Sequence, residues 1–203
     1  MGFNMKLRYS VDKKKHKQKR MGLMARTERK AIDKVFISLG IMATVVLFGA
    51  SGLAWYGYHF ATSEVRTELS EQNIYFPPKG SPGLDPAEFP DLQQYAGQLV
   101  DNGPKAKAYA NGFINRHLQK VAGGKTYAEV SSLAMKDPTN TALQQQKATL
   151  FQGETLRGLL LGDGYAYWTF GMMALYAAIA AFAGGVVMII LVGLGLRHLK
   201  RLK

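Results

Sequence analysis

The chain has 203 residues, of which 47% are hydrophobic, and a formal net charge of +12. It contains no cysteine, which excludes disulfides, thiolate metal sites and cysteine nucleophiles. The basic excess lies at the ends, because residues 1–34 carry 12 basic and 3 acidic side chains whereas residues 61–170 carry 10 and 11.

Residues 1–34 form a basic segment with few apolar side chains. Blocks of like charge repel and do not collapse, so we expect a disordered cytoplasmic tail that is attracted to anionic lipid. A tether to lipid or nucleic acid through this tail is one alternative function. We do not expect nucleic acid as a partner, because aromatic side chains for base stacking are sparse and no reader motif is present.

Two apolar runs, 35–60 and 171–196, predict transmembrane helices. The second has 26 residues without a charged residue, His, Asn or Gln. About 20 apolar residues cross the hydrocarbon core of a bilayer, and a backbone without water there must be helical. A cleaved signal peptide is the alternative for the first run, with small residues at 52–54, but the run and its basic flank are longer than such a signal.

The flanking charges predict the orientation of both spans in the cell membrane. Seven Lys/Arg residues precede the first span within 18 residues, and four follow the second in residues 197–203. The outer flanks, 61–78 and 153–170, have one each. We therefore expect both termini in the cytoplasm and residues 61–170 outside. The expected interface residues, at the aromatic and basic ends of the spans, are Lys34, Trp55, Tyr167, Trp168 and Arg197.

Small residues recur at intervals of four on the second span, at Ala177, Ala181 and Gly185. This spacing lets helix backbones approach closely and predicts either a packing seam or ordinary small residues in a span.

Residues 61–170 are expected to form a helical domain, so the fold class is mainly α, with two transmembrane helices. The first helix should continue to residue 73, followed by an extended piece at 74–76. Residues 77–90 contain five prolines and predict a proline-rich loop. A short helix is expected at 91–100.

A helical hairpin is predicted over residues 104–136. Pro104 suits a first helical turn, and apolar residues then recur at helical spacing to residue 121. Gly123 and Gly124 end this helix. Thr126 and Glu129 fit a capping box that starts the second arm.

A further helix should follow the hairpin and run to residue 161. Thr141 and Gln144 fit a second capping box at its start. A bend is expected at residues 162–164, before the second span.

Ile74–Leu199 resembles a group of small two-span membrane proteins of actinobacteria. The matching positions are Gly103-Pro104, Ala108-Tyr109-Ala110, Ile114, His117, Gly123 to Glu129 and Leu156-Arg157. Many such proteins carry the label "aromatic ring-opening dioxygenase". The resemblance transfers no catalytic residue, and the long basic tail and the proline-rich insertion depart from it.

The histidines do not support that label. Ring-opening dioxygenases bind iron through two histidines and a carboxylate. Under the predicted topology only His59 and His117 share a compartment, without a close ligand spacing, so we expect no metal, no cofactor and no catalytic residue. The sequence 124–126 resembles the end of a P-loop, but Gln119 stands where that motif needs glycine.

The sequence favours a non-enzymatic scaffold or accessory subunit in the bacterial cell membrane. Its partners would be the lipid bilayer and another membrane or envelope protein, or a second copy. An enzyme or enzyme subunit at the outer face is the alternative, with a His117–Glu129 contact as the hypothesis to test. The candidate interaction motif comprises Pro104, Tyr109, His117, Gly123, Gly124, Lys125, Thr126, Tyr127 and Glu129.

Overall fold

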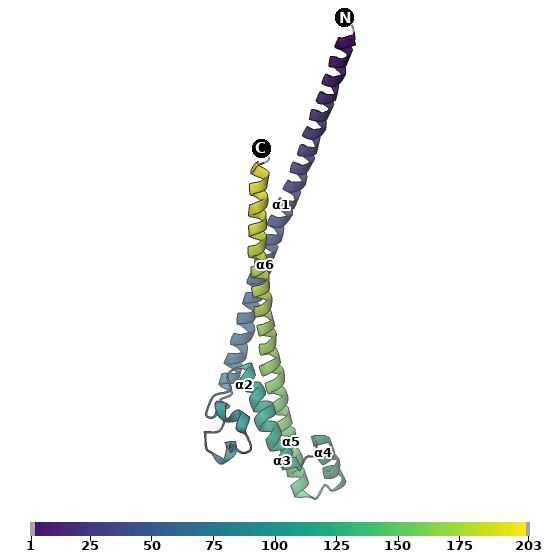
Figure 1. Cartoon of the computed structure of the whole chain (residues 1–203). Helices are drawn as coiled ribbons and strands as arrows, with labels where there is room; N and C mark the ends of the chain where they lie inside the picture. Colours follow the sequence, from purple (N-terminus) through teal and green to yellow (C-terminus); the bar gives the residue numbers. More distant parts are fainter. Residues whose placement is uncertain (1–2, 202–203) are drawn as a thin grey trace. The chain divides into compact units, whose positions relative to one another are not determined.

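The computed structural model describes residues 3–201, with side chains for Met24 and from Thr27 onward (Figure 1). The helices of the described residues are α1 (Phe3–Glu71), η1 (Pro82–Leu84), η2 (Pro90–Tyr95), α2 (Gly103–Lys107), η3 (Ala108–Ile114), α3 (Asn115–Ala122), α4 (Tyr127–Lys136), α5 (Thr141–Leu159), η4 (Leu160–Ala166) and α6 (Tyr167–Arg201).

The mainly α fold is confirmed, since the described residues are helical apart from turns, loops and an isolated antiparallel bridge between Tyr75 and Leu99. The helix α5 covers Thr141–Leu159 and continues without a break through η4 into α6. The chain divides into two compact units. The paired-helix unit contains the chain up to Leu53 and from Ala178 onward, and the central unit is Ala54–Ala177.

The basic segment differs from the disordered tail that the sequence predicted, because α1 already begins at Phe3. Lys, Arg and Gln have good intrinsic helix propensity. Nucleation is the costly step of helix formation, and extension of an existing helix gains one hydrogen bond per residue. The apolar part of α1 therefore supplies a nucleus from which the basic residues continue the helix.

In the paired-helix unit, α1 and α6 pack closely through small residues. A Cβ atom placed at Gly185 would lie 3.0 Å from the Phe48 ring, and one at Gly40 would lie 2.7 Å from Val192. The Ser51 hydroxyl donates a hydrogen bond of 2.9 Å to the Ala178 carbonyl oxygen. Small residues thus let the two backbones approach, and the buried hydroxyl has a partner.

The central unit has one hydrophobic core, and helices from α1 to η4 contribute buried residues to it. From α1 come Val65 and Leu69, and the face of α2, η3 and α3 contributes a residue at every fourth position; that set is Ala106, Ala110, Ile114, Leu118 and Ala122. In Figure 1, α5 lies between α3 and α4, and both pack against it. The predicted hairpin 104–136 therefore closes on α5 rather than on itself.

The π-helix η3 explains the spacing of four. An α-helix turns once in 3.6 residues, so every fourth residue drifts around its surface. A π-helix closes its hydrogen bonds from residue i to i+5 and uses more residues per turn. Inserting η3 between α2 and α3 keeps the buried residues on the side that faces the core. The sequence predicted a helix over 104–122 but not this change of winding.

The loop after α1 returns to the core through an extended contact. The Phe76 N–H donates to the Gln98 carbonyl oxygen at 3.0 Å, and the Val100 N–H donates to the Ile74 carbonyl oxygen at 2.8 Å. Residues 74–76 are therefore extended, as the sequence predicted. The expected helix at 91–100 is shorter and more tightly wound, because η2 ends at Tyr95 and Gly97 has φ of +70°.

The helix caps agree with the sequence at one site and differ at another. The Thr126 hydroxyl accepts from the Glu129 N–H, and the Glu129 carboxylate accepts from the Thr126 N–H, which confirms the capping box. The prediction that Thr141 caps α5 is wrong. Asn140 takes that position, and its side-chain oxygen accepts from the Leu143 N–H at 3.1 Å. Asparagine is the better cap because its short side chain reaches these N–H groups readily.

Candidate functional site

A groove of about 700 Å³ opens on the central unit, between the end of α1 and the segment that runs from α5 through η4 into α6. Its floor is apolar and buried, and it consists of Val65, Leu69, Leu160 and Gly164. Its volume lies in the range of small-molecule sites, roughly 300–1,000 Å³. The groove is therefore large enough to hold one ligand of moderate size.

Two glycines of η4 give the groove its shape. A Cβ atom at Gly164 would lie 3.0 Å from the Ala106 side chain, so this glycine lets η4 pack closely against α2. A Cβ atom at Gly162 would meet nothing within 4 Å, because this glycine faces open space. The segment is a π-helix, a form of winding that occurs frequently at functional sites.

The rim of the groove is acidic. Glu64 and Glu68 lie one helical turn apart on α1, and Asp163 lies across from them on η4. Among the side chains that the structure describes, the ion pairs join other acidic residues to basic ones and leave these three carboxylates unpaired. The groove thus combines an apolar floor with negative charge that forms no ion pair with any basic side chain in the described part of the chain.

Aromatic side chains form one end of the groove. The rings of Tyr167 and Phe170 stack with centroids 6.5 Å apart, and both residues line the groove. Aromatic faces attract cations as well as apolar groups. The aromatic end and the acidic rim therefore both favour a ligand that carries positive charge.

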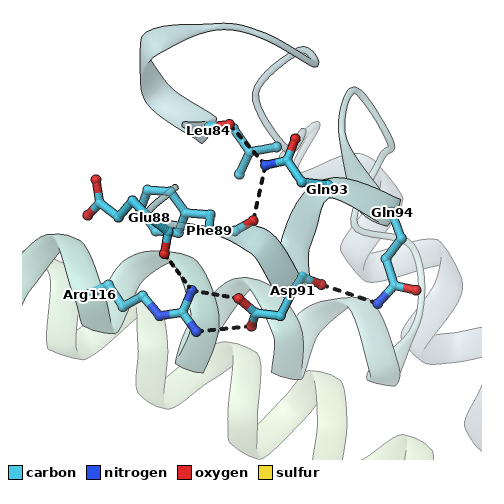
Figure 2. Close-up of polar contacts among 7 residues, drawn as sticks. All are labelled: Leu84, Glu88, Phe89, Asp91, Gln93, Gln94 and Arg116. Carbon is cyan, nitrogen blue, oxygen red and sulfur yellow. Dashed lines mark hydrogen bonds and ion pairs between the residues drawn. The ribbon is translucent and has the colours of Figure 1, made fainter. Parts of the chain in front are cut away.

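A second polar cluster fixes the proline-rich loop to the helices (Figure 2). The Arg116 guanidinium donates to both carboxylate oxygens of Asp91, at 2.7 and 3.0 Å, and to the Glu88 carbonyl oxygen at 3.2 Å. Lys120 pairs with the Glu88 carboxylate. The hydrogen bonds from Arg116 lower the pKa of the Asp91 carboxyl below its usual value. The two parallel hydrogen bonds of such a fork fix the orientation of the guanidinium relative to the carboxylate.

Gln93 closes the same loop on itself. Its side-chain amide donates to the carbonyl oxygens of Leu84 and Phe89, both at 3.0 Å (Figure 2). Leu84, Phe89 and Leu92 are buried in the core beneath. These contacts make the cluster a structural clamp for residues 77–95.

The predicted interaction motif is distributed over several structural roles. Tyr109 is half-buried, its ring packs against Phe76 and Phe113, and burial raises the pKa of its phenol. Gly123 and Gly124 adopt positive φ, +56° and +80°, which ends α3 in the left-handed region that glycine tolerates. Pro104 and Lys125 are exposed.

Glu129 does not contact His117. Its carboxylate instead accepts from the Thr126 backbone and hydroxyl, and these bonds lower its pKa. His117 is exposed on α3, whereas α4 packs against α5. The hypothesis of a His117–Glu129 pair is therefore wrong, because it assumed that the two arms of the hairpin pack on each other.

Tyr127, the remaining motif residue, belongs to an exposed apolar surface on α4 and α5. Its ring lies 5.8 Å from that of Phe151, and both border a shallow cavity of about 350 Å³ with Lys147. Met135 and Phe151 are 67% and 57% exposed. We call Tyr127, Met135 and Phe151 the α4–α5 surface.

The small residues predicted as a helix-packing seam lie in three different environments. Gly185 is buried against α1 in the paired-helix unit, and Ala181 is half-buried. Ala177 is exposed, and its neighbour Ala178 is buried in its place. Because an α-helix turns once in 3.6 residues, residues at a strict interval of four drift around its surface, and after two turns they no longer lie on the buried face.

The predicted interface residues are exposed except one. Lys34, Trp55, Tyr167 and Arg197 are exposed. Trp168 is half-buried against the core, and a Cβ atom at Gly103 would overlap its side chain. Trp168 therefore joins α6 to the start of α2.

No group of three or more His, Asp or Glu side chains in the described part of the chain is arranged to hold a metal ion. Comparisons of the chain with protein-family models, with curated proteins and with solved structures find no match.

Proposed function

We propose that this protein is a non-enzymatic integral membrane protein that spans the cell membrane twice and presents the central unit to a partner outside the cell. Both termini lie in the cytoplasm. The partner is another membrane or envelope protein, which the protein serves as a scaffold or accessory subunit.

The observation that carries this proposal is the exposure of the two apolar helices. Both are long and apolar enough to cross a membrane, and only 11% of each apolar window is buried against protein. The core helix of a soluble protein would be mostly buried. Leu53 on α1 is 76% exposed, and Ile190 on α6 is 57% exposed. Such surfaces favour a hydrocarbon environment.

The aromatic residues support a common membrane interface. In the central unit, Gly171 of α6 packs against Ala61 and Tyr58 of α1. The aromatic residues from Trp55 to Phe60 therefore lie at the same level as those from Tyr167 to Phe170. Aromatic side chains are enriched at the headgroup layer, so this level supports one interface for both helices.

The α4–α5 surface is the part of the central unit that best suits a partner. Exposed aromatic and Met side chains are enriched in protein interfaces relative to other surfaces. Tyr127 and Phe151 are rigid rings that already contact each other, so less conformational entropy is lost on binding.

Cysteine labelling tests the topology directly, because the chain has no native cysteine. Single variants Lys79→Cys and Lys125→Cys should react with a membrane-impermeant maleimide in intact cells. Variants Lys30→Cys and Lys200→Cys should react only after permeabilisation. Labelling of the second pair in intact cells would contradict the proposed orientation.

Purification of the full-length protein in mild detergent tests the partner. We expect a stoichiometric protein partner that is lost from the variant Met135→Glu/Phe151→Glu. Gln152→Glu is the matched control, since this exposed polar residue adjoins Phe151 on the same helix. Retention of the partner by the double variant would exclude the α4–α5 surface as its binding site.

A further inference from the structure

We propose that the groove between α1 and η4 binds one membrane amphiphile whose headgroup carries a net positive ammonium charge. The inference goes beyond the proposed scaffold role, and it rests on the same insertion of the two helices in a bilayer. The ligand's hydrocarbon chain lies on the apolar floor, and its headgroup lies between the carboxylates of the rim.

Charge complementarity defines the sign of the headgroup. Glu64, Glu68 and Asp163 border the groove, and none of them has an ion-pair partner among the described side chains. Basic residues are absent from the lining, which otherwise carries one amide, from Gln72, and the phenol of Tyr167. An anionic lipid would therefore meet repulsion, and a zwitterionic lipid would place its phosphate against the carboxylates.

The arrangement of the carboxylates favours an ammonium group over a metal ion. A metal ion needs several ligands converging at about 2–2.6 Å, and no such group of three occurs in the described part of the chain. An ammonium group instead spreads its charge over a larger surface. It can contact separate carboxylates and the face of an aromatic ring such as Tyr167.

The level of the groove along α1 favours an amphiphile. Phe60 ends the aromatic cluster of α1, and Glu64 and Glu68 follow it by roughly 6 and 12 Å at 1.5 Å per residue. Tyr167 and Phe170 belong both to the aromatic cluster and to the groove. The groove thus begins at the proposed headgroup layer and extends to the aqueous side of that layer, where Val65 and Leu69 of the floor lie next to Glu64 and Glu68 of the rim.

The shape of the groove favours a single molecule over a polypeptide segment. Its volume of about 700 Å³ matches a site for one small ligand. A Cβ atom at Gly162 of the π-helix η4 would meet nothing within 4 Å, so this face of the groove is open to a ligand.

Native mass spectrometry of the full-length protein, released from dodecyl maltoside micelles, tests the proposal. Decyltrimethylammonium is the probe, and decyl sulfate is the control with the same chain length and the opposite charge. We expect saturable binding of one decyltrimethylammonium per protein and no saturable binding of decyl sulfate. Because this assay needs no bilayer and no partner, its result is independent of the topology and purification experiments above.

Variants distinguish the groove from general adsorption. Glu64→Gln/Glu68→Gln should weaken binding about tenfold, through loss of two exposed carboxylates that contact the headgroup. Gly162→Leu should abolish binding by filling the groove. Gly158→Leu is the matched control, because a Cβ atom at Gly158 also meets nothing within 4 Å and this residue lies outside the lining.

Three results would overturn the proposal. One is equal binding of the cationic and anionic probes, and another is unchanged binding by Gly162→Leu. The third is a dimer of the parent protein that Gly162→Leu converts to a monomer, with no probe bound, since the groove would then be an interface between two copies.

Discussion

Arg116 connects two parts of the chain that are 25 residues apart, because its guanidinium forms a fork with the Asp91 carboxylate. A planar guanidinium can donate two parallel hydrogen bonds, whereas an ammonium group cannot match that geometry. The side chain also donates to the Glu88 carbonyl oxygen, so it fixes the backbone of the loop as well as one carboxylate.

Replacing Arg116 by Ala should loosen the proline-rich loop with a small loss of global stability. The two side chains are 36% and 53% exposed, so the ion pair contributes no more than about 1 kcal/mol. Limited proteolysis at residues 77–90 should become faster. Arg116→Lys keeps the charge and should show an intermediate rate, and equal rates for all three proteins would contradict the role of the fork.

The Asp91 carboxylate should make stability depend on acid pH. Arg116 holds the folded-state pKa below the ordinary value of 3.8, so the contribution is present above about pH 4. It is lost as the pH falls through the folded pKa, because protonation then removes the charge that the folded state favours. The difference in melting temperature between the parent and Asp91→Asn should be full at pH 6 and should shrink as the pH falls below 3.8. A constant difference would contradict this linkage.

Helix packing at the scale of elements depends on where glycine lies rather than on how many glycines a helix has. Gly185 and Gly193 are on the same helix, but only the first lies beside another side chain. In the paired-helix unit the Phe48 ring also packs edge-on against Phe182, with centroids 5.5 Å apart. A larger side chain at Gly185 would therefore have to displace the Phe48 ring, which already packs against Phe182.

Gly185→Leu should weaken the pairing of α1 with α6 by roughly 1–3 kcal/mol, the usual cost of overpacking. Gly193→Leu adds the same side chain where nothing lies within 4 Å and should change stability by less than about 0.5 kcal/mol. Unfolding by SDS in mixed micelles measures both. Equal stability of the two variants would show that Gly185 does not limit the approach of the helices.

Local signals in the sequence predicted the two long apolar helices, the helical domain between them and the Thr126–Glu129 cap correctly, because each depends on residues within a few turns. The Asn140 cap was missed because Asn140 and Thr141 both suit that position. The groove was missed because its walls come from residues nearly 100 positions apart, around Glu64 and Asp163. Glu64 and Glu68 at an interval of four gave a partial signal, but nothing in the sequence indicated which helix would lie opposite.

For the molecule as a whole, exposed apolar residues have opposite consequences in the two proposed environments. Ile190 on α6 and Phe151 on α5 are both 57% exposed. Under the proposed topology the first contacts lipid and the second contacts water or a partner. The exposed fraction alone therefore does not distinguish a lipid-facing residue from a water-facing one. A charged substitution does, because it is costly only in lipid.

Val187→Asp/Ile190→Asp should impair insertion of the second helix. A charge near the centre of a spanning helix costs about 2.5–3.5 kcal/mol on the translocon scale. Phe151→Asp should leave insertion unchanged. Extraction of membranes with alkaline carbonate measures this, and we expect the parent and Phe151→Asp in the pellet. Complete release of the parent would contradict membrane insertion.

The π-helix η4 makes the number of residues in this part of the chain matter as much as their identity. A single-turn π-helix contains one residue more than the α-helix it interrupts. One more residue inserted after Gly162 would exceed this single extra residue, and every later residue of α6 would then rotate by roughly 100° about the helix axis. Gly171, now packed against Ala61, would turn away and a bulkier neighbour would take its place. An insertion of one codon here would therefore do more damage than most substitutions.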